Sequence, residues 1–257
     1  MKLFYREYGH GATNLVILHG LLGSSRNWHT LATRLAERYR VVVPDLRNHG
    51  DSPHGEHSVD SMRQDVLDLL VDLDLTPVWL LGHSMGGLVA MEFAFRHPER
   101  LVGLIVEDIA PVSRLNRLEW IFQALESLNL HAVTSRTDAD RALQSAIPDT
   151  GVRQFLLQNL QRQPDGRFTW RCNLPELHRF VRETRAYRAP ADARYSGPTL
   201  FVGGANSEVR LADQETRIAA HFPHYRLVML PNARHWVHFD APEAFLRTVT
   251  GFIEANT

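Results

Sequence analysis

The chain has 257 residues, of which 44% are hydrophobic, so it is long enough for one α/β domain with a modest insertion. Its 28 basic residues, nearly all arginine, balance 29 acidic residues and leave a formal net charge of −1. This dispersed, near-neutral charge argues against a nucleic-acid-binding protein and against a protein held at an anionic membrane surface.

The amino terminus is typical of a strand and not of a targeting segment. Residues 1–8 are charged and alternating, without the apolar stretch of a secretory signal. We expect residues 3–8 to form an antiparallel strand at the edge of a sheet. No apolar run approaches the roughly 20 residues that span a bilayer, so the sequence predicts a soluble, cytoplasmic protein.

Six short apolar runs predict a mostly parallel sheet with helices on both faces. Each run is followed by Gly, Asp, His or Asn, and in open α/β sheets binding and chemistry collect at that carboxyl edge. The runs are residues 15–18, 41–43, 78–81, 104–106, 199–202 and 227–230.

The turn after the first run, residues 18–23, is rich in glycine and indicates a place where backbone N–H groups are free. We expect the N–H of Leu21 to be one of two donors to an oxyanion. His19 is interpreted as a structural residue that hydrogen-bonds within this turn.

The polar turn at residues 44–53 follows the second run, and we expect its charges to hold the loop in place. The next segment, His54-Gly55-Glu56-His57, superficially resembles a metal site. It lacks a helical histidine pair at i and i+4 and lies among turn-forming residues. We therefore expect no metal ion there.

Gly82-His83-Ser84-Met85-Gly86 directly follows the third run and precedes an apolar helical stretch at residues 88–95. A G-x-S-x-G turn between strand and helix exposes the serine hydroxyl and leaves the next N–H free. Ser84 is therefore the predicted nucleophile, and the N–H of Met85 is the second predicted oxyanion donor.

A serine needs a base within hydrogen-bonding reach, and His235 is the best candidate. It lies beyond the last strand, before a terminal helix that begins near Pro242. The order serine, acid, histidine is that of α/β-hydrolases. His238 is the alternative base, although it is more consistent with a position on or near the terminal helix.

The acid is less obvious, because Ser207 stands where the loop after the penultimate strand often carries an aspartate. The run at 104–106 instead ends in Glu107-Asp108, and a carboxylate at that edge can orient the histidine. Asp108 is the predicted acid. Glu208 is the alternative, and Glu107 ranks lower because neighbouring strand residues point to opposite faces.

The alternation of strands and helices stops between residues 111 and 196, which predicts a helical cap inserted into a core formed by residues 1–110 and 197–257. Apolar residues recur at helical spacing in three stretches, around 118–128, 155–160 and 180–181. An insertion at this edge is expected to act as a lid. Cys172 is the only cysteine, so no internal disulfide forms.

His19-Gly20, the loop at 45–53, the stretch at 82–87 and His235 together resemble the α/β-hydrolase superfamily across the whole chain. Further details, including residues 107–112 and 235–238, resemble the bacterial YbfF-type esterases. That resemblance implies an esterase for short acyl chains with a small helical cap and no cofactor. It also implies that Asp108 is the acid and that Ser207 assists it. Arg234 departs from the small residue common at its position.

The sequence therefore predicts a serine carboxylesterase that acts on a small-molecule ester through an acyl-enzyme. The same constellation suits a thioesterase, an acyl-carrier methyl-ester hydrolase, a C–C bond hydrolase or an acyltransferase. A hydrolase-fold binding protein with little turnover is the alternative outside the enzymes. Ser84 argues against dehalogenases and epoxide hydrolases, which carry a carboxylate at this turn.

Overall fold

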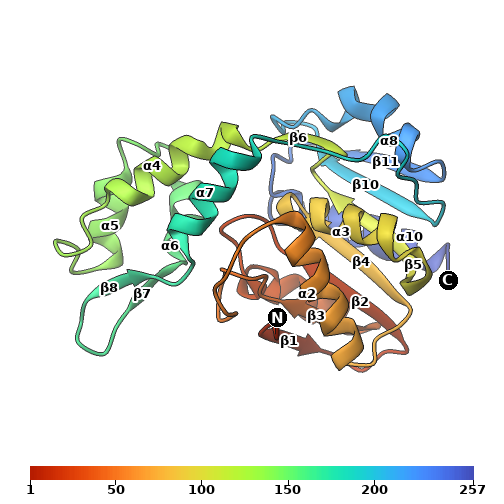
Figure 1. The fold of residues 1–257 in the computed structure, drawn as a ribbon, viewed down its shortest axis with the longest axis horizontal. Helices are drawn as coiled ribbons and strands as arrows, with labels where there is room; N and C mark the ends of the chain where they lie inside the picture. Colours follow the sequence, from red (N-terminus) through yellow and green to blue (C-terminus); the bar gives the residue numbers. More distant parts are fainter.

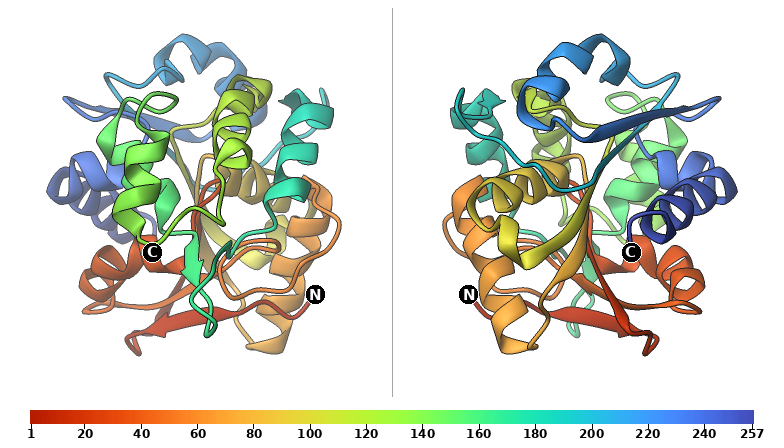
Figure 2. Two further views of the ribbon diagram at one scale, coloured as in Figure 1. Left: turned by 90° about the vertical axis from the view of Figure 1, so that its left-hand side faces the viewer. Right: turned by 90° about the vertical axis from the view of Figure 1, so that its right-hand side faces the viewer.

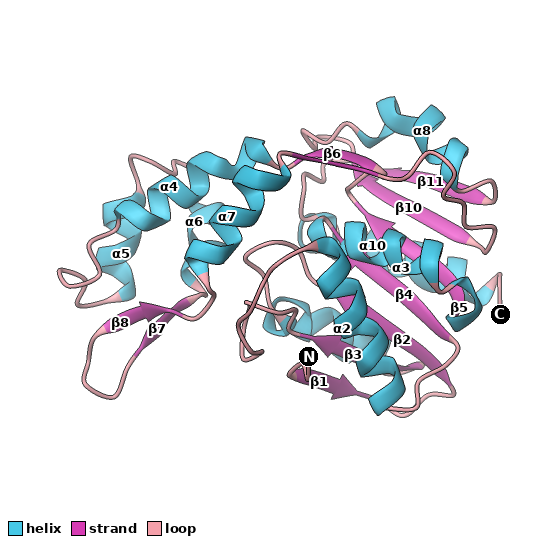
Figure 3. Cartoon of the chain, viewed as in Figure 1, coloured by secondary structure: helices cyan, strands magenta, loops and turns pink.

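The computed structural model describes residues 1–257 and is built around a seven-stranded sheet (Figures 1 and 3). The strand order is β1-β3-β2-β4-β5-β10-β11, with β1 antiparallel to β3 and all other neighbours parallel. The strands are β1 (Tyr5–Tyr8), β2 (Thr13–Leu18), β3 (Tyr39–Pro44), β4 (Val78–His83), β5 (Leu101–Glu107), β10 (Thr199–Gly204) and β11 (Tyr225–Leu230). The six predicted runs and the antiparallel edge strand are confirmed.

Helices cover both faces of this sheet, as Figure 2 shows from two sides. One face carries α1 (His29–Leu35) and α10 (Pro242–Glu254), and the other carries α2 (Val59–Asp72), α3 (Met85–Arg96) and α8 (Glu215–His221). Because side chains alternate along a strand, the apolar runs supply both cores. Leu15 and Ile17 of β2 pack in one core, and Val16 and Leu18 pack in the other.

Short helical turns lie in the connections of the sheet. The predicted terminal helix begins at Pro242, as expected, and a separate short helix, α9, precedes it. These short elements are η1 (Ser25–Trp28), η2 (Pro98–Arg100), η4 (Leu211–Gln214) and α9 (Val237–Asp240). No helix of the structure has the length and apolar content needed to cross a bilayer.

The segment between β5 and β10 forms a group of helices at one side of the sheet, at the left of Figure 1. An antiparallel ribbon of β6 and β9 joins it to the sheet. Its elements are β6 (Val112–Arg114), η3 (Asn116–Leu118), α4 (Glu119–Ser127), α5 (Arg136–Leu143), α6 (Thr150–Leu157), β7 (Leu160–Arg162), β8 (Phe168–Trp170), α7 (Leu174–Thr184) and β9 (Ala186–Arg188).

Three of these helices, α4, α6 and α7, correspond to the predicted helical stretches, with one difference. Leu160 does not continue α6; it begins β7, which pairs with β8 as a hairpin. The buried apolar residues of the segment, which include Phe122, Leu177 and the single cysteine, Cys172, are continuous with the core on one face of the sheet. Burial raises the pKa of the Cys172 thiol to about 12.

Candidate active site

Ser84 occupies a sharp turn between β4 and α3, with φ of 53° and ψ of −116°. An L residue rarely adopts this backbone conformation, and the glycines around it make the turn possible. A Cβ at Gly86 would lie 2.4 Å from the carbonyl oxygen of Leu18, and one at Gly82 would lie 2.3 Å from that of Gly86. The turn thus places the Ser84 hydroxyl at the carboxyl edge of the sheet.

The structure brings the three predicted triad residues into one hydrogen-bonded chain. His235 Nε2 lies 3.0 Å from Ser84 Oγ, and His235 Nδ1 lies 2.7 Å from Asp108 Oδ2. An ionised carboxylate only accepts hydrogen bonds, so Nδ1 donates to it and Nε2 is left to accept from the serine hydroxyl. This is the tautomer that a general base requires.

Asp108 is completely buried and has further hydrogen-bond donors besides His235. Its Oδ1 accepts from the backbone N–H of Gly204 at 3.1 Å, and its Oδ2 accepts from the hydroxyl of Ser207. The predicted supporting contact of Ser207 is therefore present. Glu208, the alternative acid, is exposed and makes no hydrogen bond to His235.

Behind this chain lies a second buried cluster that sequence reasoning did not identify: His83, Glu107 and His238. Glu107 accepts from both the backbone N–H and Nδ1 of His238, at 2.9 and 2.8 Å. His83 Nε2 donates to the carbonyl oxygen of His235 at 3.0 Å, and the Trp28 ring stacks on His238 at 4.1 Å. The cluster holds the loop that carries His235.

Burial controls the protonation of this cluster. It lowers the pKa of both His83 and His238 to about 3, so both rings are neutral near pH 7. Burial also raises the pKa of Glu107 to about 7. His238, the alternative base, is thus engaged with Glu107 and lies in α9, immediately before the terminal helix.

The two predicted oxyanion donors, the N–H groups of Leu21 and Met85, belong to different segments of the chain, the turn after β2 and the start of α3. Met85 is the first residue of α3, where an N–H has no partner within the helix. The N–H of Leu21 makes no hydrogen bond in the structure, and Leu21 lines the same cavity as Ser84. Neither N–H group therefore has a hydrogen-bond partner within the chain.

Two buried histidines hold the turn that carries Leu21. His19 Nε2 accepts from the N–H of Leu46 at 2.9 Å, and His49 Nε2 accepts from that of Leu22 at 3.1 Å. Burial lowers the pKa of both rings, which favours the neutral form that can accept. The structural role predicted for His19 is confirmed.

The polar loop at 44–53 is held by its own charges, as predicted. Asp45 accepts from the N–H groups of Ser25 and Asp51, at 2.6 and 2.8 Å, and Arg47 pairs with the buried Asp65. In the segment that follows, His54 and Glu56 are exposed, whereas His57 is buried with its ring against Phe180.

A small apolar cavity of about 70 Å³ lies above Ser84 and is lined by both the sheet edge and the helical segment. Nine of its twelve lining residues are hydrophobic, so it suits a hydrocarbon chain better than a polar group. The lining residues are Leu21, Leu22, His83, Ser84, Leu118, Ile121, Phe122, Val152, Phe155, Leu156, His235 and Trp236.

Arg234 does not line this cavity, and its side chain joins the histidine loop to the helical segment. Its guanidinium donates to Asp149 Oδ2 at 2.9 Å, and Asp149 also caps α6 by accepting from the N–H of Val152. A further link runs from Asn159, whose side chain donates to the carbonyl oxygen of Leu22 at 2.7 Å. The two parts of the site are therefore tied together by polar contacts.

Comparison with known proteins gives matches along nearly the whole chain. A model described as the Alpha/beta hydrolase family matches residues 15–248. The mouse protein named sn-1-specific diacylglycerol lipase ABHD11 is 39% identical over 93% of this chain and 80% of its own. Esterase YbfF of Escherichia coli is 31% identical over 95% of this chain and 94% of its own.

A solved structure described as a marine microorganism esterase is similar throughout. It is 33% identical, covers 98% of this chain and 99% of its own, and superposes with a TM-score of 0.93. The resemblance to YbfF-type esterases is thus confirmed by overall similarity. The chain belongs to the alpha/beta hydrolase family.

Proposed function

We propose that this protein is a serine carboxylesterase that hydrolyses esters of short-chain acids through an acyl-enzyme intermediate. The observation that carries the proposal is the hydrogen-bonded chain from Ser84 through His235 to the buried Asp108, beneath an apolar cavity. The names of the relatives, which include esterases and lipases, support an ester as the substrate class.

In the acylation step, Ser84 Oγ attacks the ester carbonyl carbon while its proton passes to His235 Nε2. The C–O bond to the alcohol then breaks, and His235 gives the proton to the departing alkoxide oxygen. Water next attacks the acyl-enzyme, with His235 again taking a proton and returning it to Ser84 Oγ. The carboxylic acid leaves, so the enzyme ends the cycle unchanged.

Negative charge develops on the carbonyl oxygen in both steps, and the N–H groups of Leu21 and Met85 are proposed to bind it. Loss of one such donor typically costs about 2.7–4 kcal/mol of transition-state stabilisation. The buried Asp108 stabilises the imidazolium form of His235 that exists while this charge is present.

The size of the cavity supports a short acyl chain. A volume of about 70 Å³ is far below the roughly 300 Å³ at the lower limit of drug-sized ligand sites. We propose that residues 111–196 act as a cap domain, because Leu118, Ile121 and Phe155 close the cavity from that side. A diacylglycerol, the substrate in the name of the mouse relative, is the second candidate.

The test compares the chain with Ser84→Ala and with Ser127→Ala, a matched control whose hydroxyl only bonds to the Ala124 carbonyl oxygen at 2.8 Å. Ser84→Ala should abolish hydrolysis of p-nitrophenyl acetate and covalent labelling by a fluorophosphonate, with an unchanged circular dichroism spectrum. Ser127→Ala should keep both. Ordinary turnover by folded Ser84→Ala would refute the proposal.

The substrate class is tested with acyl chains from acetyl to decanoyl, beside acyl-CoA thioesters, a diketone and a diacylglycerol. The highest kcat/KM is expected for the shortest oxygen esters. A maximum at long chains or at diacylglycerol would favour a lipase, and a maximum at thioesters would favour a thioesterase. Labelling of Ser84 without turnover of any substrate would indicate a binding protein.

A further inference from the structure

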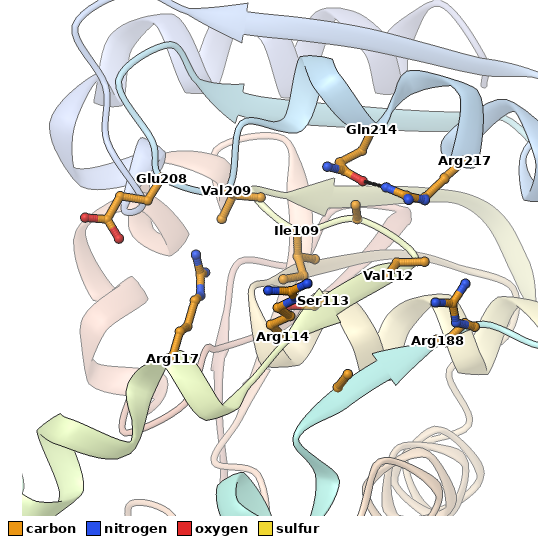
Figure 4. A pocket seen from close by; sticks show the side chains of 12 residues that line it. Ile109, Val112, Ser113, Arg114, Arg117, Arg188, Glu208, Val209, Gln214 and Arg217 are labelled. Carbon is orange, nitrogen blue, oxygen red and sulfur yellow. Dashed lines mark hydrogen bonds between the residues drawn. The ribbon is translucent and has the colours of Figure 1, made fainter.

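A second and larger cavity lies where the β6–β9 ribbon meets the sheet edge (Figure 4). Its volume is about 510 Å³, within the range of small-molecule sites. It shares no lining residue with the cavity above Ser84. We call it the arginine cavity, because Arg114, Arg117, Arg188 and Arg217 line it.

The charge of the arginine cavity is unbalanced. Four guanidinium groups face it, and the only carboxylate in its lining is that of Glu208. Arg114, Arg117 and Arg188 form no ion pair or hydrogen bond through their side chains, and Arg217 bonds only to the neutral amide of Gln214. The four arginines are exposed, and other exposed arginines of the fold, such as Arg34 and Arg210, are paired with a carboxylate.

The pairing of strands β6 and β9 places two of these charges close together. In the antiparallel ribbon, Arg114 of β6 is opposite Ala186, and Arg188 of β9 is opposite Val112. Residues two apart on a strand share a face, so Arg114 and Arg188 lie on the same face of the ribbon. Like charges on neighbouring positions of one face repel each other, and an anion bound between them would relieve that repulsion.

We propose that the arginine cavity binds a soluble small molecule that carries a phosphate or pyrophosphate group. A planar guanidinium donates two parallel hydrogen bonds to phosphate oxygens, and several guanidinium groups favour an anion with two or more charges. The site is separate from the ester site. It lies beside Asp108, because Ile109 follows that residue and lines the cavity.

The arginine cavity also adjoins the loop whose Ser207 hydrogen-bonds to Asp108. Val209 lines the cavity, and its N–H donates to the hydroxyl of Ser207 at 3.2 Å. Ser207 in turn donates to Asp108. The bound anion is therefore placed next to the two segments that hold the acid of the proposed triad.

The experiment uses the full chain and titrates it with pyrophosphate, and separately with inorganic phosphate, by calorimetry at constant ionic strength. We expect saturable one-to-one binding that is tighter for pyrophosphate. The double variant Arg114→Gln/Arg188→Gln should weaken pyrophosphate binding at least about tenfold, because each guanidinium supplies charge-assisted hydrogen bonds. Arg226→Gln, an exposed arginine of β11 outside the cavity, is the matched control and should bind as the unaltered chain does.

Because the altered side chains are exposed, the variants are expected to keep the circular dichroism spectrum of the unaltered chain. The single variant Arg117→Gln provides a second measurement and should also weaken binding. Equal binding by the double variant and the control, or uptake that never saturates, would overturn the proposal. Binding to phosphatidic acid vesicles without binding of soluble pyrophosphate would overturn it too, in favour of a membrane surface.

Discussion

Replacement of Asp108 by asparagine tests the assigned acid at the level of individual hydrogen bonds. Every neighbour of the carboxylate is a donor: Gly204 N–H to Oδ1, and His235 Nδ1 and the Ser207 hydroxyl to Oδ2. An amide NH₂ placed at the Oδ1 position would face the N–H of Gly204, which cannot rearrange. The NH₂ is therefore expected at the Oδ2 position, facing His235.

That orientation changes the tautomer of His235. Its Nδ1 must become an acceptor, so the proton moves to Nε2, which can then no longer accept the proton of Ser84. A carboxylate-to-amide change with this effect lowers kcat about 10⁴-fold in a serine protease triad. The same factor corresponds to about 5.5 kcal/mol in the activation free energy of this chain.

The assay is hydrolysis of p-nitrophenyl acetate at saturating concentration, with Ser207→Ala and Glu208→Gln as comparisons. Ser207→Ala removes one hydrogen bond to a charged group, worth about 1.5–3 kcal/mol, so kcat should fall by at most about 160-fold. Glu208→Gln alters an exposed side chain and should leave kcat unchanged. A large loss for Glu208→Gln and none for Asp108→Asn would refute the assignment.

Three other changes test the cavity, the link between the two parts of the site and the buried histidines. Phe155→Ala enlarges the cavity and should shift the preferred acyl chain toward hexanoyl. The kcat/KM for the hexanoyl ester, divided by that for the acetyl ester, should rise about tenfold or more. A double-mutant cycle of Arg234→Gln and Asp149→Asn, measured by urea unfolding, should give a coupling of about 0.2–1 kcal/mol, because both side chains are largely exposed. The free energy of unfolding should fall between pH 7 and pH 5, because the pKa of His83 and His238 is about 3 in the fold and near 6.5 when unfolded.

The sign of the pH effect follows from proton binding. At pH 5 the unfolded chain binds protons at these histidines and the fold does not, so acid stabilises the unfolded state by on the order of 2 kcal/mol per histidine. Glu107, whose pKa is raised to about 7, opposes this by about as much as one histidine. Equal stability at both pH values would contradict the prediction. The control for Phe155→Ala is Trp120→Ala, which alters an exposed side chain of α4 outside the cavity. An equal shift in acyl-chain preference in both variants would exclude a role of cavity size.

The sheet and most of the site could be predicted from the sequence, because these features depend on residues that are close together in the chain. Short runs of Val, Ile and Leu bounded by turn-forming residues favour buried strands, and the glycines at 82 and 86 are required by close backbone contacts at the turn. The acid could be placed because Asp108 follows a strand whose end meets the histidine loop. Its φ of 49° turns it out of the strand, so that Glu107 and Asp108 bind different histidines.

Features that depend on distant partners were not found in this way. Leu160 is spaced from Leu156 as if on one helix, but pairing with Trp170 of β8 places it in a strand. Helix α5 has a polar sequence with only Ala139 and Leu143 buried, so it carries little apolar periodicity. The contact of Glu107 with His238 joins residues far apart in the chain, and neither residue signals it alone.

The reactivity of the single thiol of the chain can be used to measure opening of the helical segment. Cys172 lies in the interior of that segment, with only 3% of its surface exposed, and its high pKa keeps it unreactive while the segment is closed. A disulfide-exchange reagent can therefore modify it only during transient opening, so the rate of modification rises with the population of the open state. A covalent inhibitor attached to Ser84 should slow the modification of Cys172 if the helices above Ser84 must separate during catalysis.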